Sequence, residues 1–343
     1  MKIGLVGFAG CGKSTVFQWL TGDTPDHARV QQGQVATADL PDPRVDRMVA
    51  VFKPKKTVYA EIAFLDTPGL DISERRDNPR RLGILRESDG LVVVLNGYAG
   101  GNLAKELRQF REELMFADLE ILSNRLSKVE ANLKKPKPAK EREADQFEQS
   151  VLQRLIAALE AGQMPRTLSL KPDEEKAVRS FQLLTLKAEI VFVNLGDGGG
   201  TLPADLLTLA PGALAAPAKL ELELEDLSPE DRAAFAADLG LAGSQRDDIL
   251  RRIFGAMGQI VFLTVGEDEC RAWPIPKGAD AVEGAAQIHT DLAKRFVRAE
   301  VVAYDDFCRV GSMKEAKAQG VYRLEGKTYV VQDGDIMHIL ASS

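Results

Sequence analysis

The stretch that decides the fold is Gly7-Phe8-Ala9-Gly10-Cys11-Gly12-Lys13-Ser14, close to the start of a chain of 343 residues. It fits G-x-x-x-x-G-K-[ST] at every fixed position, between a strand-like run (Lys2–Gly7) and a helical pattern (Ser14–Leu20). Glycines at these positions let backbone N–H groups and a helix N-terminus converge on phosphate. We expect Lys13 to bridge β- and γ-phosphates and Ser14 to ligate Mg²⁺, the expected cofactor. The predicted phosphate-binding residues in this loop are Gly7, Gly10, Cys11, Gly12, Lys13, Ser14 and Thr15.

A second motif, Asp66-Thr67-Pro68-Gly69, follows the alternating run Val58–Asp66. Parallel strands present their carboxyl ends at one edge of a sheet, so Asp66 is expected beside the phosphate loop. We predict that Asp66 holds Mg²⁺, directly or through water, and that the Gly69 N–H meets a γ-phosphate.

A third motif, Asn194-Leu195-Gly196-Asp197, follows the strand-like run Ile190–Val193. It resembles the N-K-x-D element that reads guanine in GTPases, with Leu195 in place of the lysine. The Asp197 carboxylate is able to accept from both guanine N1–H and the exocyclic amine. An Asx-rich turn that merely ends a strand is the alternative. The candidate base-binding residues here are Asn194, Leu195 and Asp197.

Apolar runs separated by helical patterns, including Gly90–Asn96 and Ile190–Val193, predict a parallel sheet covered on both faces. Between them two heptad-like patterns surround Lys134-Lys135-Pro136-Lys137-Pro138 and predict an inserted helical coiled-coil hairpin. The tip, Asn124–Glu143, holds seven Lys or Arg against three Glu. A solvated coiled-coil end and a docking surface for RNA phosphates are both open interpretations.

The pattern changes again beyond about residue 258, where short β-rich runs predict a small separate α/β module. The predicted parts are a P-loop NTPase domain of the α/β class (1–112 and 178–257), a helical hairpin (113–177) and a C-terminal domain (258–343). The runs expected as strands of the last part are Ile260–Thr264, Val297–Val302, Tyr322–Leu324 and Thr328–Val331, with a helix at Gly284–Ala293.

Composition narrows the class of protein. With 45% hydrophobic and 28% charged residues the chain reads as globular, and no run is long and apolar enough for a membrane span. A net charge of −7 excludes a uniformly basic nucleic-acid binder. Three scattered cysteines without CxxC spacing support neither a disulfide framework nor a zinc site, so a cytoplasmic location is expected.

Order and content together resemble the YchF family, the Obg-like ATPases within the GTPase class. The C-terminal segments that carry the resemblance are Arg271-Ala272-Trp273, Lys277-Gly278, Ile288-His289-Thr290-Asp291, Arg298-Ala299-Glu300 and Val331-Gln332-Asp333-Gly334-Asp335. They look like the family's TGS domain, a β-grasp module. Pro41-Asp42-Pro43-Arg44 matches a further family segment, and Ala218-Lys219-Leu220-Glu221 resembles the loop beside the base, which adds Lys219 to the base-binding candidates. The resemblance implies a cytoplasmic, monomeric, nucleotide-dependent switch that usually prefers ATP and associates with ribosomes, ribosomal RNA or translation factors.

Departures from the family pattern concern hydrolysis. Gly10 stands where the family's loop usually has an Asn associated with potassium, and His27–Gly33 lacks a Thr that closes on Mg²⁺. The segment Asn96–Gly101 lacks the histidine thought to assist hydrolysis, and Leu70 follows Gly69, as is usual in the family. Asp197 replaces the usual Glu, which favours guanine.

We therefore expect binding of GTP or ATP with slow hydrolysis and assign no catalytic group. The alternative is a nucleotide-gated binding protein with little or no turnover. A P-loop kinase is a weaker third choice, because no arginine-bearing lid or acceptor site is visible.

Overall fold

The computed structural model describes residues 1–71, 75–225, 227–228, 230–231, 234 and 245–342. The chain divides into two compact units. Unit 1 comprises residues 1–36 and 63–245, and unit 2 comprises residues 37–62 and 246–343. The segment 37–62 thus belongs with the C-terminal residues, although it lies early in the sequence.

A six-stranded sheet of order β2-β4-β1-β5-β6-β7 forms the centre of unit 1. The pairings of β1 with β4 and β5, of β5 with β6, and of β6 with β7 are all parallel. Its strands are β1 (Lys2–Val6), β2 (Gln34–Leu40), β4 (Ala60–Asp66), β5 (Gly90–Asn96), β6 (Ala188–Asn194) and β7 (Leu214–Ala216). Residues on both faces of β5 are buried, which confirms the predicted parallel sheet covered on both sides.

Helices of unit 1 cover this sheet and share its apolar core, in which Leu107 and Phe110 pack with Val93 and Val191. The α-helices are α1 (Lys13–Thr21), α2 (His27–Val30), α4 (Asn78–Leu85), α7 (Pro172–Val178), α8 (Ala204–Leu209) and α9 (Ala218–Glu225), and the short 3₁₀ turns are η1 (Arg75–Asp77), η2 (Pro165–Thr167), η3 (Arg179–Phe181) and η4 (Leu184–Leu186).

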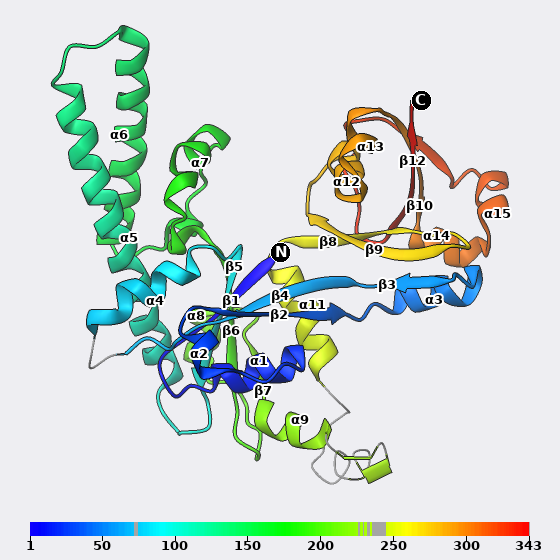
Figure 1. Ribbon diagram of the computed structural model, residues 1–343, viewed down its shortest axis with the longest axis horizontal. Coiled ribbons are helices and arrows are strands. Elements are labelled where there is room, and N and C mark those ends of the chain that lie inside the picture. Colours follow the sequence, from blue (N-terminus) through cyan, green and yellow to red (C-terminus); the bar gives the residue numbers. More distant parts are fainter. Residues whose placement is uncertain (72–74, 226, 229, 232–233, 235–244, 343) are drawn as a thin grey trace. The chain divides into compact units, whose positions relative to one another are not determined.

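The predicted hairpin consists of α5 (Leu103–Leu133) and α6 (Ala139–Glu160), drawn as two long neighbouring helices in Figure 1. Leu122 and Val129 of α5 are buried against Val151 and Leu155 of α6, as the heptad pattern indicates. Phe147 departs from that expectation, because its side chain is 43% exposed instead of lying in the seam.

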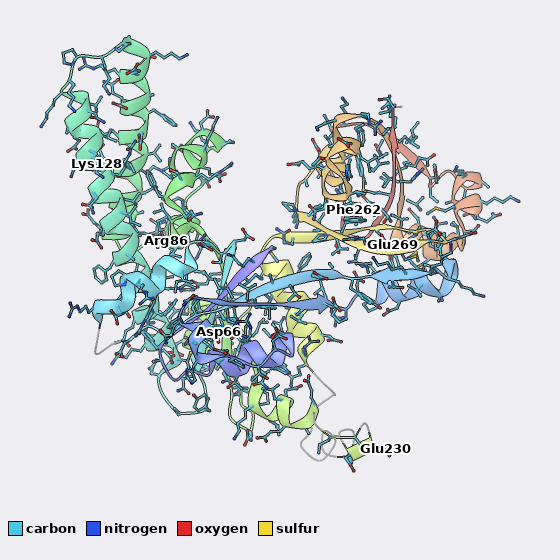
Figure 2. All side chains as sticks on the ribbon, in the orientation of Figure 1. Asp66, Arg86, Lys128, Glu230, Phe262 and Glu269 are labelled. Atoms are coloured by element: carbon cyan, nitrogen blue, oxygen red, sulfur yellow. The ribbon has the colours of Figure 1, made fainter. Side chains whose placement is uncertain are left out.

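Unit 2 is built on a second six-stranded sheet of order β11-β10-β12-β8-β9-β3. Its strands are β3 (Lys56–Val58), β8 (Gln259–Thr264), β9 (Glu269–Pro276), β10 (Phe296–Ala303), β11 (Arg323–Glu325) and β12 (Asp335–Ala341). Its helices are α3 (Pro43–Phe52), α11 (Arg246–Ala256), α12 (Ala281–Ile288), α13 (Thr290–Lys294), α14 (Tyr304–Val310) and α15 (Met313–Ala318). The core gathers around Phe262, which Figure 2 labels, with Ala285, Val301 and Met337.

The strand prediction for unit 2 is correct in part. The runs at Ile260–Thr264 and Val297–Val302 lie in β8 and β10. The run Thr328–Val331 is not a strand, since its one ladder contact is an isolated bridge between Val330 and Asp280. A tight turn closed by a hydrogen bond from Tyr329 N to Gly326 O covers the first residues of the segment.

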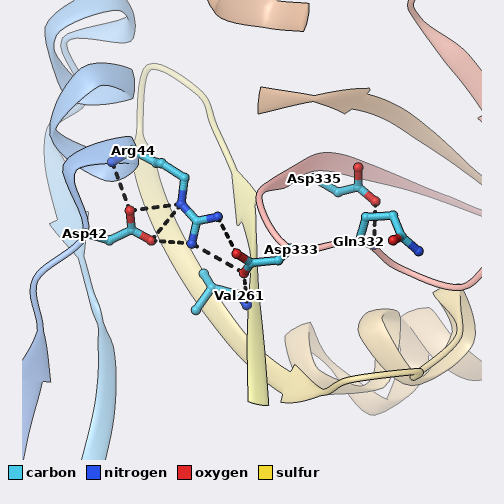
Figure 3. Close-up of polar contacts among 6 residues, drawn as sticks. All are labelled: Asp42, Arg44, Val261, Gln332, Asp333 and Asp335. Atoms are coloured by element: carbon cyan, nitrogen blue, oxygen red, sulfur yellow. Dashed lines mark hydrogen bonds and ion pairs between the residues drawn. The ribbon is translucent and has the colours of Figure 1, made fainter. Parts of the chain in front are cut away.

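Arg44 ties the early segment of unit 2 to its C-terminal part (Figure 3). Its guanidinium pairs with the carboxylate of Asp42 and, at 2.8 Å, with that of Asp333. Asp333 Oδ1 also accepts from the Val261 N–H of β8 at 2.9 Å. Burial alone would lower the pKa of Arg44, but the hydrogen bonds and negative charges of Asp42 and Asp333 together hold it above its usual range, so this cation stays charged.

Candidate functional site

The phosphate loop lies between β1 and α1, at the carboxyl edge of the central sheet. Gly12 is the N-cap of α1 and adopts φ of 87°, a left-handed conformation that glycine adopts without strain. A Cβ on Gly12 would lie 2.1 Å from Nδ2 of Asn194, so the residue also has to be glycine for space. The loop therefore approaches the end of β6 closely.

Lys13 is turned into the loop and is only 6% exposed. Its Nζ donates to Phe8 O at 3.0 Å and lies 3.7 Å from Cys11 Sγ. A Cβ on Gly69 would come within 2.8 Å of the same Nζ, which places the turn after β4 directly against this ammonium group. The structure thus brings Lys13 and Gly69 together, as the two motifs lead us to expect.

Ser14 and Asp66 form the second part of the site. The Ser14 hydroxyl donates to Asp66 Oδ2 at 2.8 Å, and Asp66, labelled in Figure 2, is fully buried. Within the described part of the chain Asp66 Oδ1 has no hydrogen-bond partner. Burial raises the pKa of this carboxyl, although Ser14 and Lys13 oppose the shift.

These groups fit a Mg²⁺ ion. A serine hydroxyl beside a carboxylate with one unsatisfied buried oxygen offers the hard oxygen ligands that Mg²⁺ prefers. Ser14 and Asp66 would hold the ion, which would neutralise charge on the phosphates. Lys13, by its position, would add a positive charge on the other side of the same phosphates.

The ends of β5 and β6 approach the loop from the side opposite Gly69. Asn96 and Asn194 are paired in register at these ends. Asn194 Nδ2 donates to Cys11 O at 3.4 Å, and Asn194 Oδ1 has no hydrogen-bond partner in the described chain. Asn96 Nδ2 and the Tyr98 hydroxyl both donate to Gly10 O.

The other predicted base-binding residues are Leu195, Asp197 and Lys219. The Leu195 N–H donates to Ala216 O at 3.0 Å, so this residue continues the edge formed by β6 and β7. The Asp197 side chain is exposed. Lys219 lies in α9, where its exposed ammonium group pairs with Glu223 at 3.6 Å.

Leu70 and Cys11 are both buried in the loop region. Leu70 is 2% exposed, its N–H donates to Gly7 O, and its carbonyl accepts from Ala9 N. An apolar side chain in this position has no group to orient a water molecule. Burial raises the pKa of the Cys11 thiol, which disfavours a reactive thiolate in the loop.

Sequence reasoning missed three residues that support the loop. Arg81 of α4 donates to Gly69 O at 2.6 Å. Glu106 of α5 accepts from Asn96 N at 3.2 Å, and its pKa is raised by burial and lowered to a smaller extent by Asn96 N–H and Lys13. Tyr98 reaches Gly10. No spacing rule singles these residues out, because their partners are backbone atoms 10 to 88 positions away in the sequence.

Comparison with known families and structures identifies the type of protein. The family described as "50S ribosome-binding GTPase" matches residues 2–126, and the YchF-GTPase C-terminal family, described as "Protein of unknown function (DUF933)", matches residues 259–342. The "Ribosome-binding ATPase YchF" of Pasteurella multocida is 31% identical over 98% of both chains, and that of Bacillus subtilis is 30% identical over 98% of both.

The chain belongs to the YchF family.

A solved structure of the Schizosaccharomyces pombe YchF GTPase agrees, with a TM-score of 0.81 and 25% identity over 99% of this chain and 97% of that one. A GTP-binding protein from Pyrococcus horikoshii shares the fold, with a TM-score of 0.60 at 16% identity over 100% of both chains. Membership of the YchF family confirms the P-loop GTPase fold that the sequence predicts. No helix in the part of the chain that the structure describes combines the length and apolar character of a membrane crossing.

Proposed function

We propose that this chain is a switch that binds a purine nucleoside triphosphate with Mg²⁺ in unit 1, hydrolyses the γ-phosphate slowly and associates with the ribosome. The observation that carries the proposal is the convergence of the Ser14–Asp66 pair, the buried Lys13 ammonium and the Gly69 turn on one edge of the sheet. Each group has the chemistry that a triphosphate with its metal needs. The phosphate-binding, metal and base-binding assignments made from the sequence form part of this proposal.

Slow turnover follows from what surrounds the γ-phosphate position. Phosphoryl transfer to water needs a positioned nucleophile and extra positive charge. Leu70 is buried beside the loop. His27, the one histidine in the segment His27–Gly33, is exposed in α2. The other two histidines, His289 and His338, lie in unit 2. The favoured function is therefore a triphosphate switch whose hydrolysis depends on a partner.

Ribosome association rests on the relatives and on the hairpin. The relatives are named as ribosome-binding ATPases, and the hairpin tip presents cationic side chains from both helices. Lys137 and Arg125 are neutralised by Asp145 and Glu148. The remaining exposed cations of the tip are Lys128, Lys134, Lys135, Lys140 and Arg142. Such a surface favours RNA phosphates through an attraction that salt weakens.

The proposal keeps the three parts predicted from the sequence: a nucleotide-binding part (1–112 and 178–257), the helical hairpin (113–177) and the C-terminal part (258–343). Residues 37–62 and 246–257 of the first part pack in unit 2, with the C-terminal residues. The protein is proposed to act as a cytoplasmic monomer. A binding-only protein remains the second candidate, favoured by the buried Leu70.

Phosphate release over many turnovers, measured with and without purified ribosomes, tests the function. A slow basal rate that ribosomes raise supports a partner-dependent switch. No release in either condition, with tight nucleotide binding retained, would favour the binding-only candidate. Sedimentation with ribosomes at 50 and 200 mM salt, for wild type and for Lys134→Glu/Lys135→Glu, tests whether the hairpin tip contributes.

A further inference from the structure

Two side-chain donors converge on one carbonyl oxygen of the phosphate loop. The Tyr98 hydroxyl donates to Gly10 O, and Asn96 Nδ2 donates to the same oxygen at 3.4 Å. Asn96 ends β5 and Tyr98 lies in the turn that follows it, 86 and 88 positions further along the chain than Gly10. Asn96 is itself oriented, because its Oδ1 accepts from Ala99 N at 3.0 Å and leaves Nδ2 free to face Gly10.

Holding this oxygen fixes the next amide group. The peptide unit is planar and trans, so the N–H of Cys11 points to the side opposite the Gly10 carbonyl. The following carbonyl, Cys11 O, is held in turn by Asn194 Nδ2 at 3.4 Å. Two successive carbonyls of a glycine-rich loop are thus tied to the ends of β5 and β6. Of their two peptide N–H groups, that of Cys11 donates to Phe8 O at 3.4 Å inside the loop, and that of Gly12 faces away from these ties.

The position of the Tyr98 ring agrees with this role. A Cβ on Gly12 would lie 3.6 Å from Cε1 of Tyr98, so the ring reaches along the loop to the start of α1. The side chain is 50% exposed, yet its hydroxyl is directed to the backbone. Burial raises the pKa of Tyr98, so the phenol keeps its proton and remains a donor throughout the neutral range.

We propose that Tyr98 is a positioning residue for phosphate binding: its hydroxyl, together with Asn96, holds the Gly10 carbonyl and so orders, in the ligand-free protein, the loop backbone that meets the diphosphate of the nucleotide. This inference rests on the proposed function, and it assigns the effect to the hydroxyl and not to the ring. A loop that is ordered before binding loses less conformational entropy when the ligand arrives. Because the ordered backbone meets the phosphates and not the base, the effect is the same for guanine and adenine nucleotides.

The test compares Tyr98→Phe with wild type, using fluorescent mant-GDP and mant-ADP as probes. Removing one hydroxyl–carbonyl hydrogen bond is expected to weaken the binding of both probes by a similar factor, about three- to tenfold. In the ligand-free protein, hydrogen exchange of the Cys11 and Gly12 amides should become faster in the variant. Tyr59→Phe is the matched control, since it removes a hydroxyl that donates to Asp46 in unit 2. It should change neither measurement.

The outcomes separate this inference from the proposed function. Unchanged affinity in Tyr98→Phe with a loss in Tyr98→Leu would overturn the inference, because only the ring would then matter. A change in the ratio of GDP to ADP affinity would overturn it as well, because Tyr98 would then act on the base. Wild type that binds neither probe would overturn the proposed function and the inference with it.

Discussion

The hydroxyl of Ser14 and the carboxylate of Asp66 are joined by a hydrogen bond of 2.8 Å, and the second oxygen of that buried carboxylate has no partner in the described chain. Fifty-two positions separate the two residues in sequence. Their meeting puts the end of β4 against the first turn of α1. A negative charge is therefore kept out of water at the cost of stability, at the place where a cation would compensate it.

Asp66→Asn should stabilise the ligand-free protein and abolish its response to Mg²⁺ with nucleotide. A raised carboxyl pKa means that the folded protein binds the proton more tightly than the unfolded chain. Stability from this group is thus present at low pH and falls as pH rises from the ordinary Asp range through the raised pKa. Asparagine does not ionise and so avoids this loss of stability. We therefore expect the variant to melt a few degrees higher than the wild type at pH 7. Melting curves from pH 4 to 8 that run parallel in the two proteins would contradict this reasoning.

Lys13→Ala should remove most of the stabilisation by nucleotide. Ligand at about 100 times its dissociation constant stabilises the wild type by about 2.7 kcal/mol. The variant lacks the ammonium group that faces the phosphates, so its melting temperature should barely change with added nucleotide. Thermal unfolding with Mg²⁺ and GTP or ATP checks this. Lys128→Ala, an exposed change on α5, is the control that should keep the full shift.

Turnover by the isolated protein should be slow, on the order of 10⁻³ s⁻¹ or less, as for GTPases without an added arginine. It should also be the same in potassium and sodium buffers, since Gly10 offers no side-chain ligand for a cation. Steady-state phosphate release in the two buffers is the measurement. A strong increase in potassium alone would show that another group binds that ion.

Leu70→Gln should not create a faster enzyme. Leu70 packs in the core with Phe8 and Phe110, so the glutamine amide would be buried without partners. We expect a loss of about 2–4 kcal/mol in unfolding free energy and no gain in phosphate release. Leu70→Met, which keeps an apolar side chain of similar volume, should cost less than about 1.5 kcal/mol. A stable, faster Leu70→Gln variant would show that this turn swings out when nucleotide binds.

GTP should bind more tightly than ATP by a modest factor. The Asp197 carboxylate accepts two hydrogen bonds from guanine but faces only acceptors on the N1 edge of adenine. An unmatched carboxylate costs about 1–3 kcal/mol, which is about 5- to 150-fold in affinity, and the exposure of Asp197 reduces that figure. Competitive titrations of both nucleotides decide the order. If Asp197→Ala keeps the preference of the wild type, this carboxylate does not read the base.

Much of the candidate site could be predicted because the residues that form it lie in short local motifs. Residues 7–15 and 66–69 follow buried strands, and the parallel sheet brings such ends to one edge without further information. Asn194 was predicted for the base, and the structure adds its contact with Cys11 O. The supporting contacts from Tyr98, Glu106 and Arg81 could not be predicted, because each joins a side chain to a backbone atom whose position only the folded sheet determines.

The fold was harder to predict where strands lack strong apolar character. β2 alternates correctly, but its inward residues include Gln34 and Ala36, which carry little hydrophobic signal. β9 contains Pro274 and Pro276, residues that usually argue against a strand. Conversely, Thr328–Val331 is rich in β-branched residues yet forms only an isolated bridge, because β propensity reflects packing opportunities more than backbone preference.

Strand β3 has a consequence for how the protein is made. Its residues pair in parallel with β9, and Lys56 lies opposite Glu269, more than 200 positions later. At about 5–20 residues per second, translation supplies that partner on the order of 10–40 s after β3 has been synthesised. Once β7 has been synthesised, the sheet of unit 1 has all its strands, while β3, in the segment between β2 and β4, has not yet met its partner β9. A nascent chain stopped near residue 245 would therefore expose an unpaired strand edge, which makes this segment a natural contact for a chaperone and a poor place to truncate the protein.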